Sequence, residues 1–227
     1  MSFGLAHGRM LDVGNIGLAM STLCTGKPGT VDPRSLFVDD VEPPRRCEIE
    51  IGTGKGTFLL QQAKLQEQVN FLGFEWTSEF YRYTADRIRR RELRNVRVVH
   101  GDATEFLCHW CCDDVIDVIH LYFSDPWPKK RHHKRRVIQD HTLVAMHRAL
   151  RKGGEVRIVT DHDDLWQWCV DHAQRHEQLF QRQPFAGVDS AAAGEMVGSN
   201  FERKYAREGR PFHAMTLVKR TVSQRPD

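Results

Sequence analysis

The chain has 227 residues, of which 40% are hydrophobic and 28% are charged. This composition is close to the globular average and excludes disordered, collagenous and low-complexity proteins. The length predicts one domain with a single core rather than two very small ones. No apolar run approaches the roughly 18 residues of a membrane-spanning helix, and Gly14, Asn15 and Gly17 interrupt the stretch that comes nearest to a signal peptide. We therefore expect a cytoplasmic protein that does not associate with membranes.

The formal net charge is only +3, which is too small to indicate a partner, but its distribution is uneven. Six cations fall within eight residues, at Lys129, Lys130, Arg131, Lys134, Arg135 and Arg136. The rest of the chain is therefore net acidic, and the basic character is local.

Six cysteines are present, and without a signal peptide they are expected to be reduced thiols. Cys108 and Cys111 have the spacing of half a zinc site, but no second pair completes four ligands elsewhere. We expect no metal site, and half-buried thiols on a helix instead.

From Cys47 onward, short β-branched runs alternate with helical patterns, which is typical of a parallel sheet with crossover helices. Strands are expected at 47–51, 70–75, 96–100, 115–123 and 155–160, and helices at 57–66, 78–93, 104–111, 137–150 and 163–175. Residues 1–30 are expected to form a partly irregular extension that lies over the domain or stays loose, and residues 31–227 a single domain.

The pattern changes after Arg175, where 178–185 and 212–220 are expected to be two strands of an antiparallel hairpin at the sheet edge. Residues 187–198, between them, are rich in Ala, Gly and Ser and show no period. This composition predicts a mobile loop or linker.

The first predicted strand runs into a glycine loop that leads into a helix, in the segment Glu50-Ile-Gly-Thr-Gly-Lys-Gly56. Gly52, Gly54 and Gly56 would let a ligand approach the backbone, but neither a dinucleotide fingerprint nor a phosphate-binding P-loop is present. Because Glu50 would repel a pyrophosphate and attract a cation, the loop favours S-adenosylmethionine, which carries a sulfonium and an ammonium.

Two further acids follow the next two predicted strands. Glu75 is placed to accept both ribose hydroxyls, and Asp102, before Ala103, to accept from an adenine amino group. The alternative is that the glycines only turn strands into helices and the acids only cap them. Three such motifs at successive strand ends favour a binding site.

The fourth predicted strand runs into Asp125-Pro-Trp-Pro-Lys-Lys-Arg-His-His-Lys-Arg-Arg136. With this segment and those at 50–56, 73–75, 101–103, 160–161 and 199–202, the sequence resembles the bacterial tRNA (guanine-N7)-methyltransferase family. The resemblance implies an α/β, Rossmann-like class I methyltransferase fold. Its sheet would have seven mostly parallel strands, an antiparallel C-terminal edge hairpin and helices on both faces.

The resemblance also implies methyl transfer from S-adenosylmethionine, leaving S-adenosylhomocysteine, to N7 of a guanosine in the tRNA variable loop at tRNA position 46. In that family the residues matching Glu50, Glu75, Asp102 and Asp125 contact the donor, and the one matching Asp125 is also assigned to the active site. The positions assigned to the RNA match Lys129, Asp161, Ser199, Asn200, Phe201 and Glu202. No obligatory protein partner is expected, whether the enzyme is a monomer or a homodimer.

The chemistry of N7 agrees with these assignments, because its in-plane lone pair can attack a sulfonium methyl without first losing a proton. Positioning is then the main task. From the basic run we expect Arg131, Lys134, Arg135 and Arg136 to contact RNA phosphates. Cations are unfavourable at the positive end of a helix dipole, so their presence before a predicted helix indicates a functional role. A solvated charged helix start is the alternative. His132 and His133 are expected to contact phosphate or solvent rather than a metal.

Several residues have two possible roles. Trp127 could stack on a base or fill space in the fold. Ser199-Asn-Phe-Glu202 is also an ordinary helix capping box. Arg203, Lys204, Arg207 and Arg210 extend the basic surface or are simply solvated.

The chain departs from the family at Ser124, which replaces a proline, at Ser199, which replaces a threonine, and in an N-terminus without an arginine-rich arm. The competing functions are a methyltransferase for a small molecule or protein, and a donor-binding RNA-binding module without efficient turnover.

Overall fold

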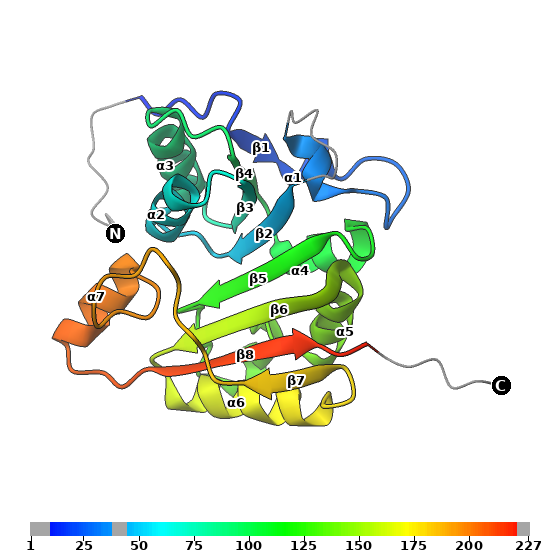
Figure 1. Ribbon diagram of the computed structural model, residues 1–227, viewed down its shortest axis with the longest axis vertical. Helices are drawn as coiled ribbons and strands as arrows, with labels where there is room; N and C mark the ends of the chain where they lie inside the picture. Colours follow the sequence, from blue (N-terminus) through cyan, green and yellow to red (C-terminus); the bar gives the residue numbers. More distant parts are fainter. Residues whose placement is uncertain (1–9, 38–44, 222–227) are drawn as a thin grey trace.

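A computed structural model describes residues 10–37 and 45–221. They form an eight-stranded sheet in the order β1-β4-β3-β2-β5-β6-β8-β7, flanked by helices (Figure 1). The strands are β1 (Gly17–Ala19), β2 (Arg46–Ile51), β3 (Val69–Glu75), β4 (Val96–His100), β5 (Ile116–Tyr122), β6 (Leu150–Thr160), β7 (Phe180–Gln183) and β8 (His213–Lys219). The helices are α1 (Met20–Leu23), α2 (Thr57–Leu65), α3 (Ser78–Arg89), α4 (Ala103–Glu105), α5 (Asp140–Ala149), α6 (Asp163–Arg175) and α7 (Asn200–Arg207).

The strands from β1 to β6 pair in parallel, and β8 pairs antiparallel with both β6 and β7. The chain moves outward from β2 through β3 to β4 and then returns to β5, on the other side of β2. In open α/β sheets ligands bind where the strand order reverses, at the carboxyl ends of the strands. The fold therefore directs attention to the ends of β2 and β5.

Alternate residues of each central strand point to opposite faces of the sheet, and each face has its own apolar cluster. Phe58, Leu59 and Ala63 of α2 pack on one face together with residues of α3. The other face is covered by side chains of α4, the π-helical turn after it, α5 and α6, among them Phe106 of that turn and Leu143 of α5. Helices on both faces and the edge hairpin confirm the expected fold class.

One strand was not expected. Gly17–Ala19, within the N-terminal extension, pairs in parallel with Val98–His100 of β4, so the sheet has eight strands rather than seven. The following residues continue along the domain, since Val31 forms a parallel bridge with Cys111. Part of the extension is thus built into the sheet.

The basic segment also differs from expectation, because the helix expected at 137–150 begins only at Asp140. Residues Lys130–Arg135 instead form a 3-10 helix, and Gln139 caps α5 through a reciprocal hydrogen bond with Thr142. A continuous helix would place cations at a positive N-terminus, whereas this arrangement puts Asp140 there. The helix expected at 104–111 is the short α4 followed by a π-helix, Phe106–Trp110.

Residues 187–198, expected to be a mobile loop, follow a defined path in which Val188 and Val197 are buried. Within the described ranges, no helix combines the length and apolar character that crossing a membrane requires.

Candidate active site at the carboxyl edge of the sheet

The glycine loop after β2 has a backbone that requires glycine. Gly52, Gly54 and Gly56 have φ angles of +81°, +52° and +66°, in the left-handed region that disfavours residues with a Cβ. A Cβ on Gly56 would lie 2.4 Å from the Thr84 methyl carbon, and the Thr84 hydroxyl donates to the Gly54 carbonyl at 2.8 Å. Helix α3 thus fixes the loop close to the ends of β2 and β3.

Glu75, the last residue of β3, joins this loop to the start of α3. Its carboxylate accepts from the Gly54 N–H at 2.8 Å and from the Thr77 N–H at 2.9 Å. Burial raises the pKa of Glu75, although these two hydrogen bonds lower it, and the charge of Asp125 raises it further. Glu75 is therefore held rigidly beside the loop, with Asp125 near enough to act on it electrostatically.

Glu50 is the most unusual carboxyl group of the site. Its side chain is only 5% exposed, and in the described part of the chain Oε2 has no hydrogen-bond partner. Burial raises the pKa of Glu50 well above its ordinary value, and neighbouring Glu75 adds to the effect. A buried carboxylate without a partner is costly unless a cation or donor reaches it. The site is therefore suited to a ligand that brings a positive group.

Asp102 and Ala103 stand at the end of β4. Asp102 Oδ1 accepts from the Thr104 backbone N–H at 2.8 Å and from its hydroxyl at 2.7 Å, which caps α4. The alternative role considered for this acid, helix capping, is therefore confirmed. Capping uses only Oδ1, so Oδ2 can still accept from a ligand. Met20 of α1 packs against neighbouring Gly101, where a Cβ would come within 2.6 Å of the Met20 Cβ.

Asp125 lies on a strained turn after β5. Phe123 and Trp127, on either side of it, have φ angles of +53° and +44°, and such left-handed non-glycine residues cost about 1–3 kcal/mol each. The Pro126 carbonyl between them accepts from Arg136 Nε at 2.9 Å. The Asp125 side chain is exposed and free to receive a ligand.

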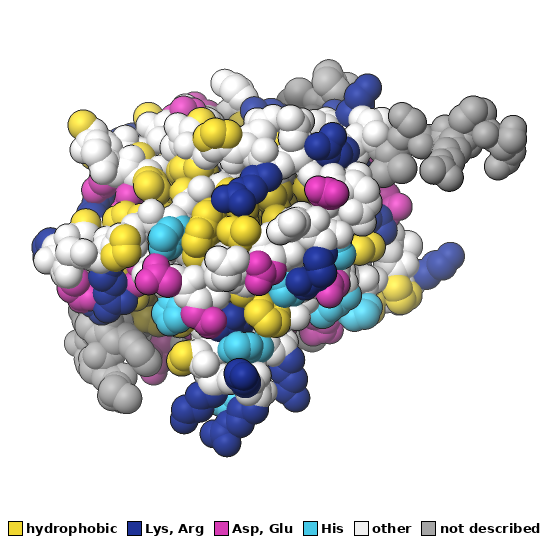
Figure 2. Space-filling model, turned by 90° about the horizontal axis from the view of Figure 1, so that it is seen from below, with side chains coloured by type: hydrophobic (Ala, Val, Ile, Leu, Met, Phe, Trp, Pro, Cys, Tyr) yellow, Lys and Arg dark blue, Asp and Glu magenta, His cyan; other side chains and the backbone are white. Residues whose placement is uncertain are grey.

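The basic run projects beyond this turn. Its exposed cations are Lys129, Lys130, Arg131, Lys134 and Arg135. Figure 2 shows Lys and Arg side chains gathered in a projecting cluster, with His among them. Trp127 does not point into empty space, because the Arg135 guanidinium lies 4.8 Å from its ring centre and His132 contacts its edge.

Arg136 differs from the rest of the run and corrects one expectation. Its side chain is buried, forms an ion pair with Asp164 and lies over the Trp168 ring at 5.0 Å. Together with its bond to Pro126, these contacts make Arg136 a brace for the Asp125 turn. It is not available to RNA phosphates.

Helix α7 and its N-cap residue provide four more of the expected substrate residues, Ser199, Asn200, Phe201 and Glu202. The helix lies beside the carboxyl ends of β5 and β6 (Figure 1). Ser199 caps the helix by accepting from the Glu202 N–H at 3.0 Å. Asn200 donates to the Thr57 hydroxyl of α2 at 2.8 Å. The Phe201 ring stands over the glycine loop, 3.2 Å from where a Cβ on Gly54 would be.

Glu202 corrects a second expectation, because it is only 2% exposed. Its carboxylate accepts from the backbone N–H groups of Met196, Val197 and Gly198. Glu202 therefore anchors the preceding loop and cannot contact RNA directly.

Asp161, at the end of β6, is paired with Arg210 at 2.7 Å. Arg210 also lies over the Tyr205 ring, 4.2 Å from its centre. Tyr205 was not singled out in the sequence. The signal that could have found it is its position three residues after Glu202, on a helix whose start was already predicted.

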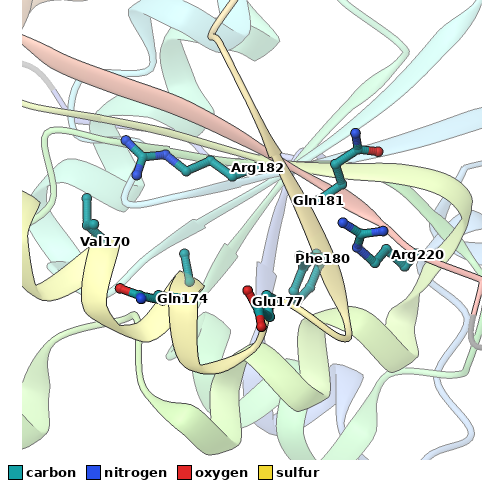
Figure 3. A pocket seen from close by; sticks show the side chains of 8 residues that line it. Val170, Gln174, Glu177, Phe180, Gln181, Arg182 and Arg220 are labelled. Atoms are coloured by element: carbon teal, nitrogen blue, oxygen red, sulfur yellow. The ribbon is translucent and has the colours of Figure 1, made fainter.

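The cysteines and the groove between α6 and β7 do not contribute to this site. Among the described residues, no three His, Cys, Asp or Glu side chains gather as metal ligands, and burial raises the pKa of Cys111 to about 12. Figure 3 shows a groove of about 440 Å³ between α6 and β7, which Phe180, Arg182 and Arg220 help to line. Phe180 pairs with Lys219 at the far end of β8, which places the groove at the opposite edge of the sheet from Asp161.

Comparison with known proteins identifies the family. A family model described as "Putative methyltransferase" matches residues 44–215. The tRNA (guanine-N(7)-)-methyltransferase of Agrobacterium fabrum is 34% identical over 186 residues, covering 82% of this chain and 78% of the relative. That of Rhodopseudomonas palustris strain BisA53 is 36% identical over 191 residues, covering 81% and 72%.

Solved structures agree on the fold. The aminoglycoside resistance methyltransferase NpmB1 superposes with a TM-score of 0.54 at 18% identity, covering 86% of this chain and 99% of that one. The precorrin-6y C5,15-methyltransferase of Geobacter metallireducens gives 0.52 at 16% identity, covering 78% and 81%. With the acids and glycines gathered at the carboxyl edge of such a sheet, and with relatives this similar over most of their length, the chain belongs to the tRNA (guanine-N7)-methyltransferase family.

Proposed function

We propose that this protein transfers a methyl group from S-adenosylmethionine to N7 of a guanosine in the variable loop of tRNA, at tRNA position 46. The observation that carries the proposal is Glu50, whose buried Oε2 has no partner within the described residues. It lies at the sheet edge that also holds Glu75 and Asp125. Three carboxyl groups around one loop favour a cationic ligand over a phosphate.

Each part of the donor has a matching group. Glu50 and Asp125 would hold its ammonium end, and Glu75 its ribose hydroxyls through charge-assisted hydrogen bonds. Asp102 Oδ2 would accept from the adenine amino group, beside the small side chain of Ala103. Gly52, Gly54 and Gly56 allow the backbone to approach closely.

When bound, S-adenosylmethionine supplies an electrophilic methyl group, and its carbon–sulfur electron pair returns to sulfur as the guanine N7 lone pair forms the new bond. No residue has to remove a proton first. Asp125 faces the incoming base from a turn that Arg136 braces, and its charge stabilises the positive charge that develops on the purine. The residues act mainly by holding two reactants in line.

The RNA would be held by two surfaces beside this site. Lys129, Arg131, Lys134 and Arg135 are exposed and would neutralise phosphates. Asp161, Ser199, Asn200 and Phe201 would border the target nucleotide. We further propose that the enzyme works in the cytoplasm, with residues 31–227 as one methyltransferase domain and without an obligatory protein partner, as a monomer or a homodimer.

Single-turnover methylation of unmodified tRNA by Asp125→Asn tests the proposal. Loss of a positioning contact of about 3 kcal/mol predicts a rate about a hundredfold lower at saturating donor. Melting temperature and tRNA affinity should be unchanged. Asp171→Asn, on the exposed face of α6, is the matched control and should behave as wild type. A wild-type rate in Asp125→Asn would end the catalytic assignment, and equal loss of stability and of both ligands would show that Asp125 only fixes the turn.

A further inference from the structure

The arrangement of Arg210 resembles a base bound in a recognition site. Its guanidinium donates from Nη1 to Asp161 Oδ2 at 2.7 Å and lies over the Tyr205 ring, 4.2 Å from its centre. Its other terminal nitrogen reaches Glu208 at 2.7 Å. A flat cation thus donates to a carboxylate along its edge and stacks on an aromatic ring with its face.

Guanine presents the same two features. Its N1–H and N2 amino group are parallel donors on one edge, as two N–H groups of a guanidinium are, and its ring has a face that stacks on aromatic side chains. Because N7 lies on a different edge of the purine, a guanine held through N1 and N2 leaves N7 open to attack. Adenine has an acceptor at N1 and would set a lone pair against the carboxylate.

The position of these residues fits the target base. Asp161 follows β6, next to the turn that carries Asp125 after β5. The Tyr205 ring packs against Phe123, the residue that begins this turn, with 5.9 Å between ring centres. The charges of both Asp161 and Asp125 contribute to raising the pKa of Tyr205, although its partial burial is the main cause. Tyr205 is therefore close enough to both carboxylates to be affected by their charges.

The two partners differ in how easily they can separate. The Asp161 side chain is 11% exposed, whereas that of Arg210 is 45% exposed, so Asp161 is the fixed partner and Arg210 the one that can leave. Ion pairs with such an exposed member are weak. Arg210 also keeps a second partner, Glu208, when it leaves.

We propose that Asp161 and Tyr205 form the seat of the target guanine, and that Arg210 occupies this seat in the RNA-free enzyme until the base displaces it. Asp161 accepts from N1–H and the N2 amino group, and Tyr205 stacks on the ring. Arg210 is thus a placeholder that satisfies the Asp161 carboxylate when no base is bound. This inference rests on the proposed function.

The seat is tested with tRNA that carries inosine in place of the methylated guanosine, since inosine keeps N7 and N1–H but lacks the N2 amino group. Losing one hydrogen bond to a carboxylate predicts a wild-type kcat/KM about 10- to 100-fold lower for inosine. The ratio of kcat/KM for guanosine tRNA to kcat/KM for inosine tRNA should fall close to 1 in Asp161→Ala. Tyr205→Leu should lose about tenfold or more of kcat/KM for guanosine, and Tyr205→Phe should retain it. A wild-type ratio near 1, or one that stays high in Asp161→Ala, would overturn the seat.

The placeholder role is tested by Arg210→Gln against Arg207→Gln, a neighbouring exposed arginine whose Nε donates to the Arg203 carbonyl. Both changes remove one positive charge near the RNA, but only Arg210→Gln opens the seat. Because the displaced ion pair is weak, we expect the KM for tRNA to fall about two- to fivefold in Arg210→Gln relative to Arg207→Gln. The slope of log affinity against log salt should stay at the wild-type value in Arg210→Gln.

If Arg210 is instead an ordinary phosphate contact, the KM of Arg210→Gln for tRNA will rise at least as much as that of Arg207→Gln. The slope of log affinity against log salt will then become shallower by about 0.9. That result would overturn the placeholder role. Failure of the proposed function would be seen separately. In that case the wild-type enzyme would not methylate N7 of guanosine in tRNA, and this result is obtained before any variant is compared.

Discussion

Replacing Glu50 by Gln should stabilise the free protein while weakening its hold on the donor. The pKa of Glu50 is raised by burial and by Glu75. A carboxyl with a raised pKa contributes stability that is fully present below its unfolded pKa and is lost as the pH rises through the folded value. At every pH above its unfolded pKa, Glu50 therefore lowers the free energy of unfolding relative to acid conditions, and Glu50→Gln removes this penalty.

The size of the effect follows from the contacts of the side chain. An unsatisfied buried group costs about 1–3 kcal/mol, and more when it is charged. Gln keeps a polar group at this position but cannot carry the charge, so Glu50→Gln should raise Tm by about 2–10 °C for a chain of this size. The same change removes a charged acceptor for the donor's ammonium group, which should weaken donor affinity by about 10- to 100-fold. Stability and binding are thus expected to change in opposite directions.

Glu48, two residues earlier on the same strand, is the matched control. It is also buried, but it accepts from Arg46 at 3.0 Å and bonds to His120 Nε2 at 2.8 Å. Burial alone would raise the pKa of Glu48, yet the His120 hydrogen bond and the charges of His120 and Arg46 lower it. Its contribution to stability is present above the unfolded pKa and lost as the pH falls, so Glu48→Gln should lower Tm at neutral pH.

The assay is thermal unfolding between about pH 5 and about pH 9, with and without S-adenosylhomocysteine, which keeps the donor's ammonium group. Wild type should gain more Tm from this ligand than Glu50→Gln does. The advantage of Glu50→Gln over wild type should grow as the pH rises. If Glu50→Gln lowers Tm as Glu48→Gln does, or gains the full ligand shift, the assignment of Glu50 to the donor is refuted.

Three further outcomes are expected. Lys134→Ala/Arg135→Ala should make the slope of log tRNA affinity against log salt shallower by about 0.9 per lost phosphate contact, without changing donor affinity in calorimetry. The control Arg151→Ala/Lys152→Ala, at two exposed positions at the start of β6, should change neither the salt slope nor the donor affinity. Arg136→Lys should lower the free energy of unfolding by about 1–3 kcal/mol in denaturant titrations and keep the salt slope, and a shallower slope would return Arg136 to the RNA surface. Glu202→Ala should speed amide hydrogen exchange at residues 196–198, whose N–H groups it anchors, and unchanged exchange would contradict that role.

Much of the fold could be predicted because the central strands are buried on both faces and appear in the sequence as apolar, β-branched runs. The donor site could be predicted for a related reason, since acids and glycines directly after successive parallel strands must meet at one edge. Strand β1 could not be predicted, because its three residues, Gly17–Ala19, are too few to show a hydrophobic pattern.

The side-chain partners at the site depend on contacts between distant parts of the chain. Arg136 pairs with Asp164, 28 residues away, and Arg210 with Asp161, 49 residues away. A run of cations shows the charge of a segment but not which member folds inward. Glu202 likewise looked like a capping residue, while the three backbone groups it accepts from depend on the path of the preceding loop.

The central claim is tested most directly by locating the methyl group. Unmodified tRNA is incubated with the protein and labelled S-adenosylmethionine, and the product is cleaved chemically at N7-methylated guanines and sequenced. The proposed function predicts label at one guanine N7 in the variable loop, appearing about a hundredfold more slowly with Asp125→Asn than with wild type. Label at another atom or another nucleotide, or no transfer at all, would contradict the account.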